Sequence, residues 1–172
     1  MIRSSRPRDF ESSVRPHLSV LYRVGLRLTR NAEEAEDLVS QTMVNAFNAW
    51  SRFDGDYVRS WLIKILRNEF LNVQRRKGSR PVEVELDDAE GVSDTSWTEV
   101  VGRLEAGRIL EEVDRLPEEY RLAVTLCDVE QMSYEEAAEA MDVPVGTVRS
   151  RLFRGRARLR QRLGHVVAEE VR

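Results

Sequence analysis

Residues 133–163 read SYEEAAEAMDVPVGTVRSRLFRGRARLRQRL, and this stretch has the pattern of two helices joined by a tight turn. Ser133 can cap the first helix, and Glu136 follows at the spacing of a capping box. Asp142 falls where the chain must reverse, and Asp is among the few residues other than glycine that tolerate a left-handed conformation. The second helix starts after Pro144 and carries an apolar stripe at helical spacing, formed by Val148, Leu152, Leu159 and Leu163. The stretch therefore predicts a helix-turn-helix.

The second helix of this motif is strongly basic, because residues 149–162 hold seven arginines and no acidic residue. In a helix-turn-helix the second helix enters the DNA major groove. Arginine can bind a guanine edge through its planar fork or pair with phosphate, and it stays charged throughout. A solvated face and a membrane-surface helix are the alternatives. The helix lacks the aromatic-rich apolar face of a membrane helix, and the capped helix and turn before it favour DNA binding.

The total charge of the chain, which is −3, hides two basic ends. Residues 1–80 and 147–172 each carry a net charge of +6, whereas residues 81–100 carry −7 and residues 101–146 carry −8. A polyanion responds to the local field of a basic end rather than to the total charge. A chain of 172 residues can form one medium domain or two small ones.

Residues 81–96, PVEVELDDAEGVSDTS, indicate a boundary between two domains. They have no helical apolar period and are rich in acidic residues, serine and glycine. This composition predicts a linker, which is either a solvated loop or a segment that lies in or near a basic channel of a partner. A further hypothesis is that the acidic segment shields the basic faces of the free protein from DNA.

Three segments before the linker have helical periodicity. The first covers residues 10–28 and the third runs from Tyr57 to Lys77, after the loop SRFDGD, in which Gly55 signals a turn. The second opens with Asn31, which can cap it, and has Glu34 at the capping-box position. Its apolar stripe consists of Ala35, Leu38, Val39, Thr42, Ala46, Phe47 and Trp50. Residues 98–115 and 117–129 are also expected to be helical, and no run of strand period competes, so the predicted fold class is all-α.

The sequence argues against several classes of protein. No stretch reaches the roughly eighteen apolar residues of a membrane span. The basic N-terminus lacks the apolar stretch of a secretory signal, so we expect a cytoplasmic protein without membrane insertion. Cys127 is the single cysteine and is expected to be a small buried hydrophobe. Together with two scattered histidines it shows no ligand spacing, so we expect no metal site and no cofactor.

Three stretches resemble the extracytoplasmic-function sigma factors, which are small sigma-70-type initiation subunits of bacterial RNA polymerase. Residues 116–163, which end in the helix-turn-helix, resemble the promoter-binding C-terminal domain of the family. Residues 32–55, AEEAEDLVSQTMVNAFNAWSRFDG, and 59–77, RSWLIKILRNEFLNVQRRK, resemble its other domain. The resemblance implies sigma region 2 over residues 1–80, an acidic linker over residues 81–97 and sigma region 4 over residues 98–172.

The resemblance implies that the helix after Asn31 docks on the clamp helices of the polymerase core. The matching positions are Asp37, Leu38, Gln41 and Thr42. The sequence departs from the family pattern at Ser40 and Gln41, where the family usually has Gln followed by an acidic residue. From the residues alone, the polar side chains of this helix form an outward face that is either solvated or covered by a partner.

The resemblance also implies that the third helix and the loop before it handle the minus-ten promoter element, which must be melted before transcription. A base pulled out of a duplex needs a pocket with aromatic walls and polar contacts to its edge. Asn68 matches the family position that contacts the flipped base, and its amide supplies both a donor and an acceptor. The expected minus-ten residues are Phe53, Asp56, Lys64, Arg67, Asn68, Arg75 and Arg76, whereas Trp61 and Phe70 are expected in the core.

For the minus-thirty-five element, the matching positions lie on the second helix of the helix-turn-helix. Arg149, Ser150 and Phe153 are expected to read bases, although Phe153 could instead be a core residue. Thr147, Arg151 and Arg154 are expected nearer the DNA backbone, and the four arginines between residues 156 and 162 are expected to be phosphate contacts or surface charge. The sequence has Gln131 and Asp142 where the family commonly has glycine, and Ala138 where it has a bulkier aliphatic residue.

The sequence thus predicts a sigma factor that is not an enzyme, binds polymerase core and directs it to promoter DNA. The resemblance also implies an anti-sigma factor as a partner, since the family often has one. One alternative is a conventional helix-turn-helix regulator that dimerises and binds a palindromic operator without polymerase. A second alternative, a nuclease, would need convergent carboxylates or a metal cluster, which the outward acidic residues of this chain do not suggest.

Overall fold

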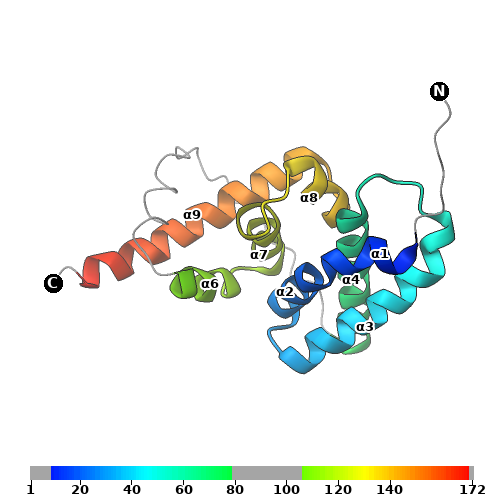
Figure 1. The fold of residues 1–172 in the computed structure, drawn as a ribbon. Coiled ribbons are helices and arrows are strands. Elements are labelled where there is room, and N and C mark those ends of the chain that lie inside the picture. The colour runs from blue at the N-terminus through cyan, green and yellow to red at the C-terminus, as the bar shows by residue number, and fades with distance from the viewer. Residues whose placement is uncertain (1–8, 79–105, 171–172) are drawn as a thin grey trace. The chain divides into compact units, whose positions relative to one another are not determined.

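A computed structural model describes residues 9–78 and 106–170 of the chain, and all of its regular elements in these ranges are helical (Figure 1). The all-α fold class is therefore confirmed. The described residues form two compact units, the first containing residues 9–78 and the second most of residues 106–170. The expected linker and the first half of the helix expected over residues 98–115 lie outside the described residues.

The first unit contains four α-helices and two short 3₁₀ turns. In chain order they are α1 (Phe10–Val14), η1 (Arg15–His17), α2 (Leu18–Thr29), α3 (Ala32–Ala49), η2 (Trp50–Arg52) and α4 (Val58–Arg76). The single helix expected over residues 10–28 was wrong in one respect, because the α-helix is interrupted at η1. Pro16 lies in this turn and has no backbone N–H to donate to the preceding helical turn.

The junction between α2 and α3 combines a left-handed residue with a side-chain cap. Arg30 ends α2 with a φ of 55°, and Asn31 accepts a hydrogen bond from the Glu34 backbone N–H at 3.0 Å. The predicted Asn31 cap is thus confirmed. The Glu34 carboxylate does not complete a capping box; it lies 2.9 Å from the Lys77 Nζ and so joins the start of α3 to the end of α4.

The core of the first unit lies between α2, α3 and α4. Its fully buried side chains include Leu21, Leu62 and Leu66, and Phe70 is 3% exposed, as expected for a core residue. The predicted burial of Phe47 was wrong, because this ring is 64% exposed. It lies edge-on to Phe10, with the ring centroids 5.3 Å apart, at the surface of the unit.

The second unit contains α6 (Ala106–Asp114), α7 (Glu118–Val124), a π-helical turn η3 (Thr125–Val129), α8 (Tyr134–Met141) and α9 (Val145–Glu170). The helix expected over residues 117–129 is therefore α-helical only as far as Val124. Cys127 lies in the π-helical turn and is buried, as expected. Gln131 follows with a φ of 54°, in the left-handed region that favours glycine, and its side-chain amide donates to the Asp128 carbonyl at 2.7 Å.

The helix-turn-helix consists of α8, the turn at residues 142–144 and the start of α9. Ser133 and Glu136 form a reciprocal capping box, each side chain accepting the other residue's backbone N–H, at 3.1 and 2.9 Å. Asp142 has a φ of 56°, which confirms the predicted left-handed turn residue. The predicted apolar stripe of α9 is also confirmed, with Val148, Leu152, Leu159 and Leu163 all at most 2% exposed.

Candidate nucleic-acid interface

The first half of α9 presents the residues that the sequence assigns to the minus-thirty-five element. Ser150, Phe153 and Arg154 lie on the side of the helix away from the buried stripe, at about 100° per residue, and all three are partly exposed. The Ser150 hydroxyl donates to the Thr147 carbonyl at 3.0 Å, which fixes its rotamer. Phe153 is partly exposed and is therefore not a fully buried core residue.

Arg149 is the exposed arginine nearest the start of α9. Its guanidinium carbon lies 5.7 Å from the centre of the Tyr134 ring of α8, within cation–π distance. The aromatic face of Tyr134 orients the Arg149 guanidinium, and no acidic side chain pairs with Arg149 among the described contacts. Arg149 is therefore well placed to bind a base edge or a phosphate.

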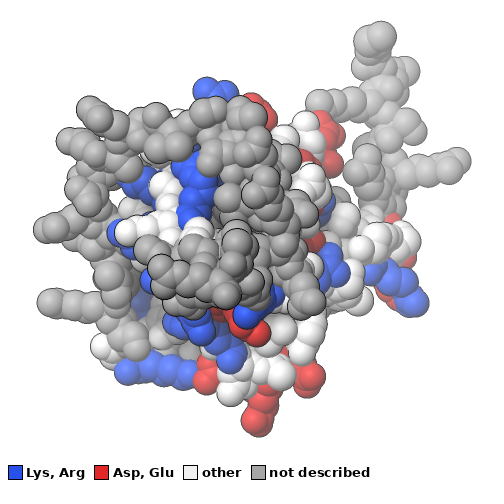
Figure 2. All heavy atoms as spheres, turned by 90° about the vertical axis from the view of Figure 1, so that its left-hand side faces the viewer, with Lys and Arg blue, Asp and Glu red and all other residues white. Residues whose placement is uncertain are grey.

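Three other arginines of α9 are held by carboxylates of the second unit. Arg151 lies 3.0 Å from Glu119 of α7, Arg156 lies 2.6 Å from Asp128 of η3, and Arg162 lies 3.6 Å from Glu112 of α6. The expectation that Arg156 is a phosphate contact or surface charge was wrong, because its side chain is 16% exposed and is held at two points by Asp128, which is itself only 18% exposed. In the view of Figure 2, basic side chains lie beside acidic ones. Part of the arginine run therefore stabilises the unit.

The helix α4 places part of the expected minus-ten set on one face. Lys64, Asn68 and Arg75 are separated by four and seven residues, a spacing that brings their side chains to one side of a helix, and Asn68 and Arg75 are exposed. Arg67, three residues after Lys64, lies at the edge of this face. Arg76 lies about 120° away, and its side chain pairs with Glu69 at 3.0 Å. The structure therefore does not group Arg76 with the others.

The loop before α4 is held by a cluster of aromatic rings formed by Trp50, Phe53 and Trp61. Phe53 stacks on Trp50, with the ring centroids 5.4 Å apart, and lies 4.6 Å from Trp61. Gly55 is needed at the next turn, because a Cβ there would come within 3.0 Å of the Phe53 ring. Phe53 is thus an anchor of the loop and is partly covered, whereas Asp56 is exposed at the bend.

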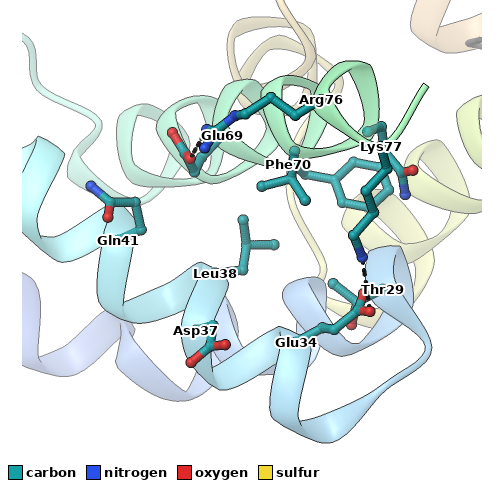
Figure 3. Close-up of a pocket in the computed structure, with 11 residues that line it drawn as sticks. Thr29, Glu34, Asp37, Leu38, Gln41, Glu69, Phe70, Arg76 and Lys77 are labelled. Atoms are coloured by element: carbon teal, nitrogen blue, oxygen red, sulfur yellow. Dashed lines mark hydrogen bonds and ion pairs between the residues drawn. The ribbon is translucent and has the colours of Figure 1, made fainter. Parts of the chain in front are cut away.

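A groove of about 330 Å³ lies between α3 and α4 and contains three of the four positions assigned to core binding (Figure 3). Asp37 and Gln41 are exposed on α3, and Leu38 forms part of the groove between them and Phe70. The fourth position, Thr42, is not in the groove. It is fully buried, and its hydroxyl donates to the Leu38 carbonyl at 2.7 Å. It supports the helix and offers no surface to a partner.

The sequence did not lead us to expect that two apolar residues of α3 are exposed. Val44 is 54% exposed and Phe47 is 64% exposed, and Phe47 lies beside Leu18 and Met43 in a shallow depression against α1. A helical projection would have found Phe47, because nine residues from Leu38 correspond to about half a turn of rotation around the axis. The exposed surface of α3 therefore combines acidic, amide and apolar side chains, which is typical of a protein interface rather than of a solvated face.

The described residues contain no group of histidine, cysteine and acidic side chains that could hold a metal ion. Burial raises the pKa of the Cys127 thiol to about 11, with Asp128 acting in the same direction. This thiol is therefore protonated near neutral pH and is not a candidate nucleophile or ligand. No helix in the described ranges is long and apolar enough to cross a membrane.

Comparison with known proteins gives a consistent family for both units. Residues 14–80 match the family profile of Sigma-70 region 2, and residues 106–159 match that of Sigma-70, region 4. The ECF RNA polymerase sigma factor SigE of Mycolicibacterium smegmatis is 36% identical over 158 residues, which are 90% of this chain and 62% of SigE. The RNA polymerase sigma-H factor of Pseudomonas aeruginosa is 32% identical over 155 residues, which cover 84% of this chain and 80% of that protein. This chain thus spans less than two thirds of the length of SigE.

Solved structures with the same fold include two proteins that are bound to other proteins. The sigma factor RpoE, in complex with the anti-sigma factor NepR from Bartonella quintana, matches with a TM-score of 0.69 and 28% identity, over 92% of this chain and 98% of that chain. CnrH, in complex with the cytosolic domain of CnrY, matches with a TM-score of 0.66 and 25% identity, over 94% of this chain and 92% of that chain.

Proposed function

Since this chain belongs to the extracytoplasmic-function sigma factors of the sigma-70 family, we propose that it binds the core of bacterial RNA polymerase and directs it to a subset of promoters. The observation that carries the proposal is the pairing, in one chain, of a region 2 unit and a region 4 unit that each present a basic helical face. The protein acts through binding energy and supplies no catalytic residue or cofactor. The proposed domains are residues 1–80 and 98–172, joined by residues 81–97.

In the region 4 unit, α9 is the proposed reader of the minus-thirty-five element. Arg149, Ser150 and Phe153 are the candidates for base contacts, since they are exposed or partly exposed on one half of the helix. Arginine can bind the O6 and N7 acceptors of guanine together, and an aromatic edge can contact a thymine methyl group. Thr147 and Arg154 are the candidates for contacts to the phosphate backbone.

In the region 2 unit, the face of α4 that carries Lys64, Asn68 and Arg75 is the proposed contact with the minus-ten element. The exposed Asn68 amide can pair with the edge of an unstacked base, and the neighbouring cations can follow the phosphates. The contacts of Phe53 with Trp50 and Trp61 hold the adjacent loop, and Asp56 is exposed at the bend of this loop. A rigid loop beside the basic face reduces the entropy lost on capturing a base.

The exposed face of α3 is the proposed docking surface for polymerase core. It offers the polar residues Asp37 and Gln41 together with the apolar residues Val44 and Phe47. Exposed aromatic residues of this kind supply much of the affinity in protein interfaces. Because Ser40 and Gln41 replace a charged pattern of the family, this docking depends more on apolar contacts than on ion pairs. An anti-sigma factor is proposed as a second partner, by analogy with the bound state of RpoE.

The proposal is tested by transcription in vitro with bacterial core polymerase and fragmented bacterial DNA, with and without the protein, followed by sequencing of the RNA 5′ ends. The proposal expects new start sites that share two sequence elements, upstream of each start and without palindromic symmetry. A conventional regulator would instead bind a palindromic site in the absence of core and would add no start sites. That second result would replace the proposed function with the regulator alternative.

A further inference from the structure

The contact between Arg151 and Glu119 links the proposed DNA-reading helix to α7. The Arg151 Nη2 lies 3.0 Å from the Glu119 Oε2, and the two side chains are 16% and 35% exposed. Arg151 follows Thr147 by four residues and precedes Arg154 by three, so all three lie on the same flank of α9. A cation on the proposed DNA-binding flank is thus occupied by an acidic group of the protein itself.

The three arginine–carboxylate pairs of α9 differ in how accessible the acidic partner is. The carboxylate side chains of Asp128 and Glu112 are 18% and 12% exposed, whereas that of Glu119 is 35% exposed. Arg156 also holds Asp128 at two points, while a single ion-pair contact is resolved between Arg151 and Glu119. Arg162 is 44% exposed and lies 3.6 Å from Glu112, but it is eleven residues beyond Arg151 on α9. Of the two pairs nearer the start of α9, the pair at Glu119 is therefore the one that an incoming anion can open more readily.

We propose that Glu119 competes with DNA phosphate for Arg151, and that this competition lowers the affinity of the region 4 unit for non-specific DNA. This inference rests on the proposed function, since it assumes that α9 meets DNA. When a phosphate approaches, the guanidinium exchanges one anionic partner for another, and the Glu119 carboxylate returns to water. A phosphate can bind the planar fork of arginine at least as well as a single carboxylate oxygen does.

The exchange makes Arg151 a conditional contact. A promoter site that already engages base-reading residues holds the helix in place, so a phosphate can displace Glu119 from Arg151. A random duplex lacks those contacts and is bound mainly through phosphates. Such a duplex gains little affinity from Arg151 as long as the Glu119 carboxylate remains paired with it. Glu119 therefore acts as a specificity-determining residue that does not itself touch DNA.

The inference is tested by fluorescence anisotropy with the full chain, a short labelled duplex of the upstream promoter element and a scrambled duplex, over about 50 to 200 mM salt. Glu119→Gln is expected to steepen the dependence of log affinity on log salt for the scrambled duplex by about 0.9, which corresponds to one added phosphate contact. It should bind that duplex about two- to fivefold more tightly at low salt. The preference for the promoter duplex should fall.

The matched control is Glu111→Gln, which removes one exposed charge of α6 and should leave the salt slope unchanged, since the α6 carboxylate that pairs with α9 is Glu112. Arg151→Gln provides a second control, because Glu119→Gln should have no effect on the slope in that background. Glu119 lies in the first turn of α7, where an acidic group stabilises the helix. If Glu119→Gln fails to fold, Glu119→Asp replaces it in the test. This variant keeps the negative charge but reaches less far toward Arg151, so its salt slope should lie between those expected for wild type and Glu119→Gln.

Equal salt slopes for Glu119→Gln and Glu111→Gln would overturn the inference, as would a gain that persists in the Arg151→Gln background. Failure of the proposed function would look different. The wild-type protein would then show no preference for the promoter duplex and no core-dependent transcription, while the slopes on the scrambled duplex would still report whether Arg151 is released.

Discussion

Arg156 and Asp128 form a two-point ion pair, in which the Nη2 lies 2.6 Å from one carboxylate oxygen and the Nε lies 3.1 Å from the other. The pair joins α9 to the π-helical turn η3, where the chain leaves α7. An arginine from the basic run thus fixes the recognition helix to its support. The basic run therefore serves two purposes, since part of it positions the helix and part of it is left for DNA.

Asp128→Asn is expected to lower the free energy of unfolding by about 2 kcal/mol, because it removes the charge of the carboxylate that holds the mostly buried Arg156 guanidinium at two points. Urea denaturation followed by circular dichroism measures the change. Glu135→Gln, at an exposed position of α8, is the matched control and should change the stability by less than about 0.5 kcal/mol. Equal stabilities of the two variants would show that the ion pair contributes nothing.

Gly155→Ala is expected to destabilise the second unit by about 1–3 kcal/mol. A Cβ at Gly155 would lie 2.9 Å from the Val124 Cγ2 and 3.4 Å from the Tyr120 Cβ, so α7 and α9 would have to separate. Gly164→Ala, farther along the same helix, meets no atom within 4 Å and should be stabilising by up to about 1 kcal/mol. Thermal unfolding of both variants tests the contrast, and a stabilising effect at Gly155 would contradict the close packing.

The stability of the protein should fall as the pH rises above about 9, in part because of Cys127. Burial raises the pKa of this thiol from 9.0 to about 11 in the folded state. Between these values the unfolded chain releases the thiol proton while the folded chain retains it, so ionisation favours unfolding by up to about 1.4 kcal/mol per pH unit. Denaturation at pH 8 and pH 10.5 should therefore show a smaller loss for Cys127→Ala than for wild type, and equal losses would contradict the raised pKa.

Phe47→Ser should weaken binding to polymerase core by about thirtyfold, since an exposed aromatic residue at an interface contributes about 2 kcal/mol. Association is measured by titrating labelled protein with core. Val129→Ser replaces another exposed apolar side chain, in the second unit, and should leave the affinity unchanged. If the two variants bound core equally well, α3 would not dock in the proposed way.

Arg149→Ala should reduce affinity for the upstream element by about 1–3 kcal/mol and relax the preference at one base pair. The reason is that this guanidinium is exposed and oriented by the Tyr134 ring. Competition binding against duplexes with single base changes measures the effect. A uniform loss on all sequences, with a shallower salt dependence, would make Arg149 a phosphate contact instead.

The elements that the sequence predicted well are those set by local chemistry. The capping box of Ser133 and Glu136, the left-handed Asp142 and the Asn31 cap depend on residues within a few positions of each other. The apolar stripe of α9 is likewise a matter of spacing along one helix. Such features can be inferred without knowing what packs against them.

The parts that the sequence did not predict depend on contacts between distant segments. The Arg156–Asp128 and Lys77–Glu34 pairs join residues 28 and 43 positions apart, so nothing in the local pattern indicates them. The exposure of Phe47 was missed for another reason, because the helical projection that places it about half a turn from Leu38 was not applied and an aromatic residue in an apolar stripe is usually buried. The π-helical turn after Val124 also has no signal in a periodicity that assumes a regular helix.

By the proposed function, this chain makes polymerase core initiate at a specific set of promoters. The most direct measurement is run-off transcription from one promoter fragment found by start-site sequencing, with core alone, with core and the protein, and with each of the two elements scrambled in turn. A transcript is expected only when core, the protein and both elements are present. A transcript that is independent of the protein, or promoter binding by the protein that never yields a transcript with core, would contradict it.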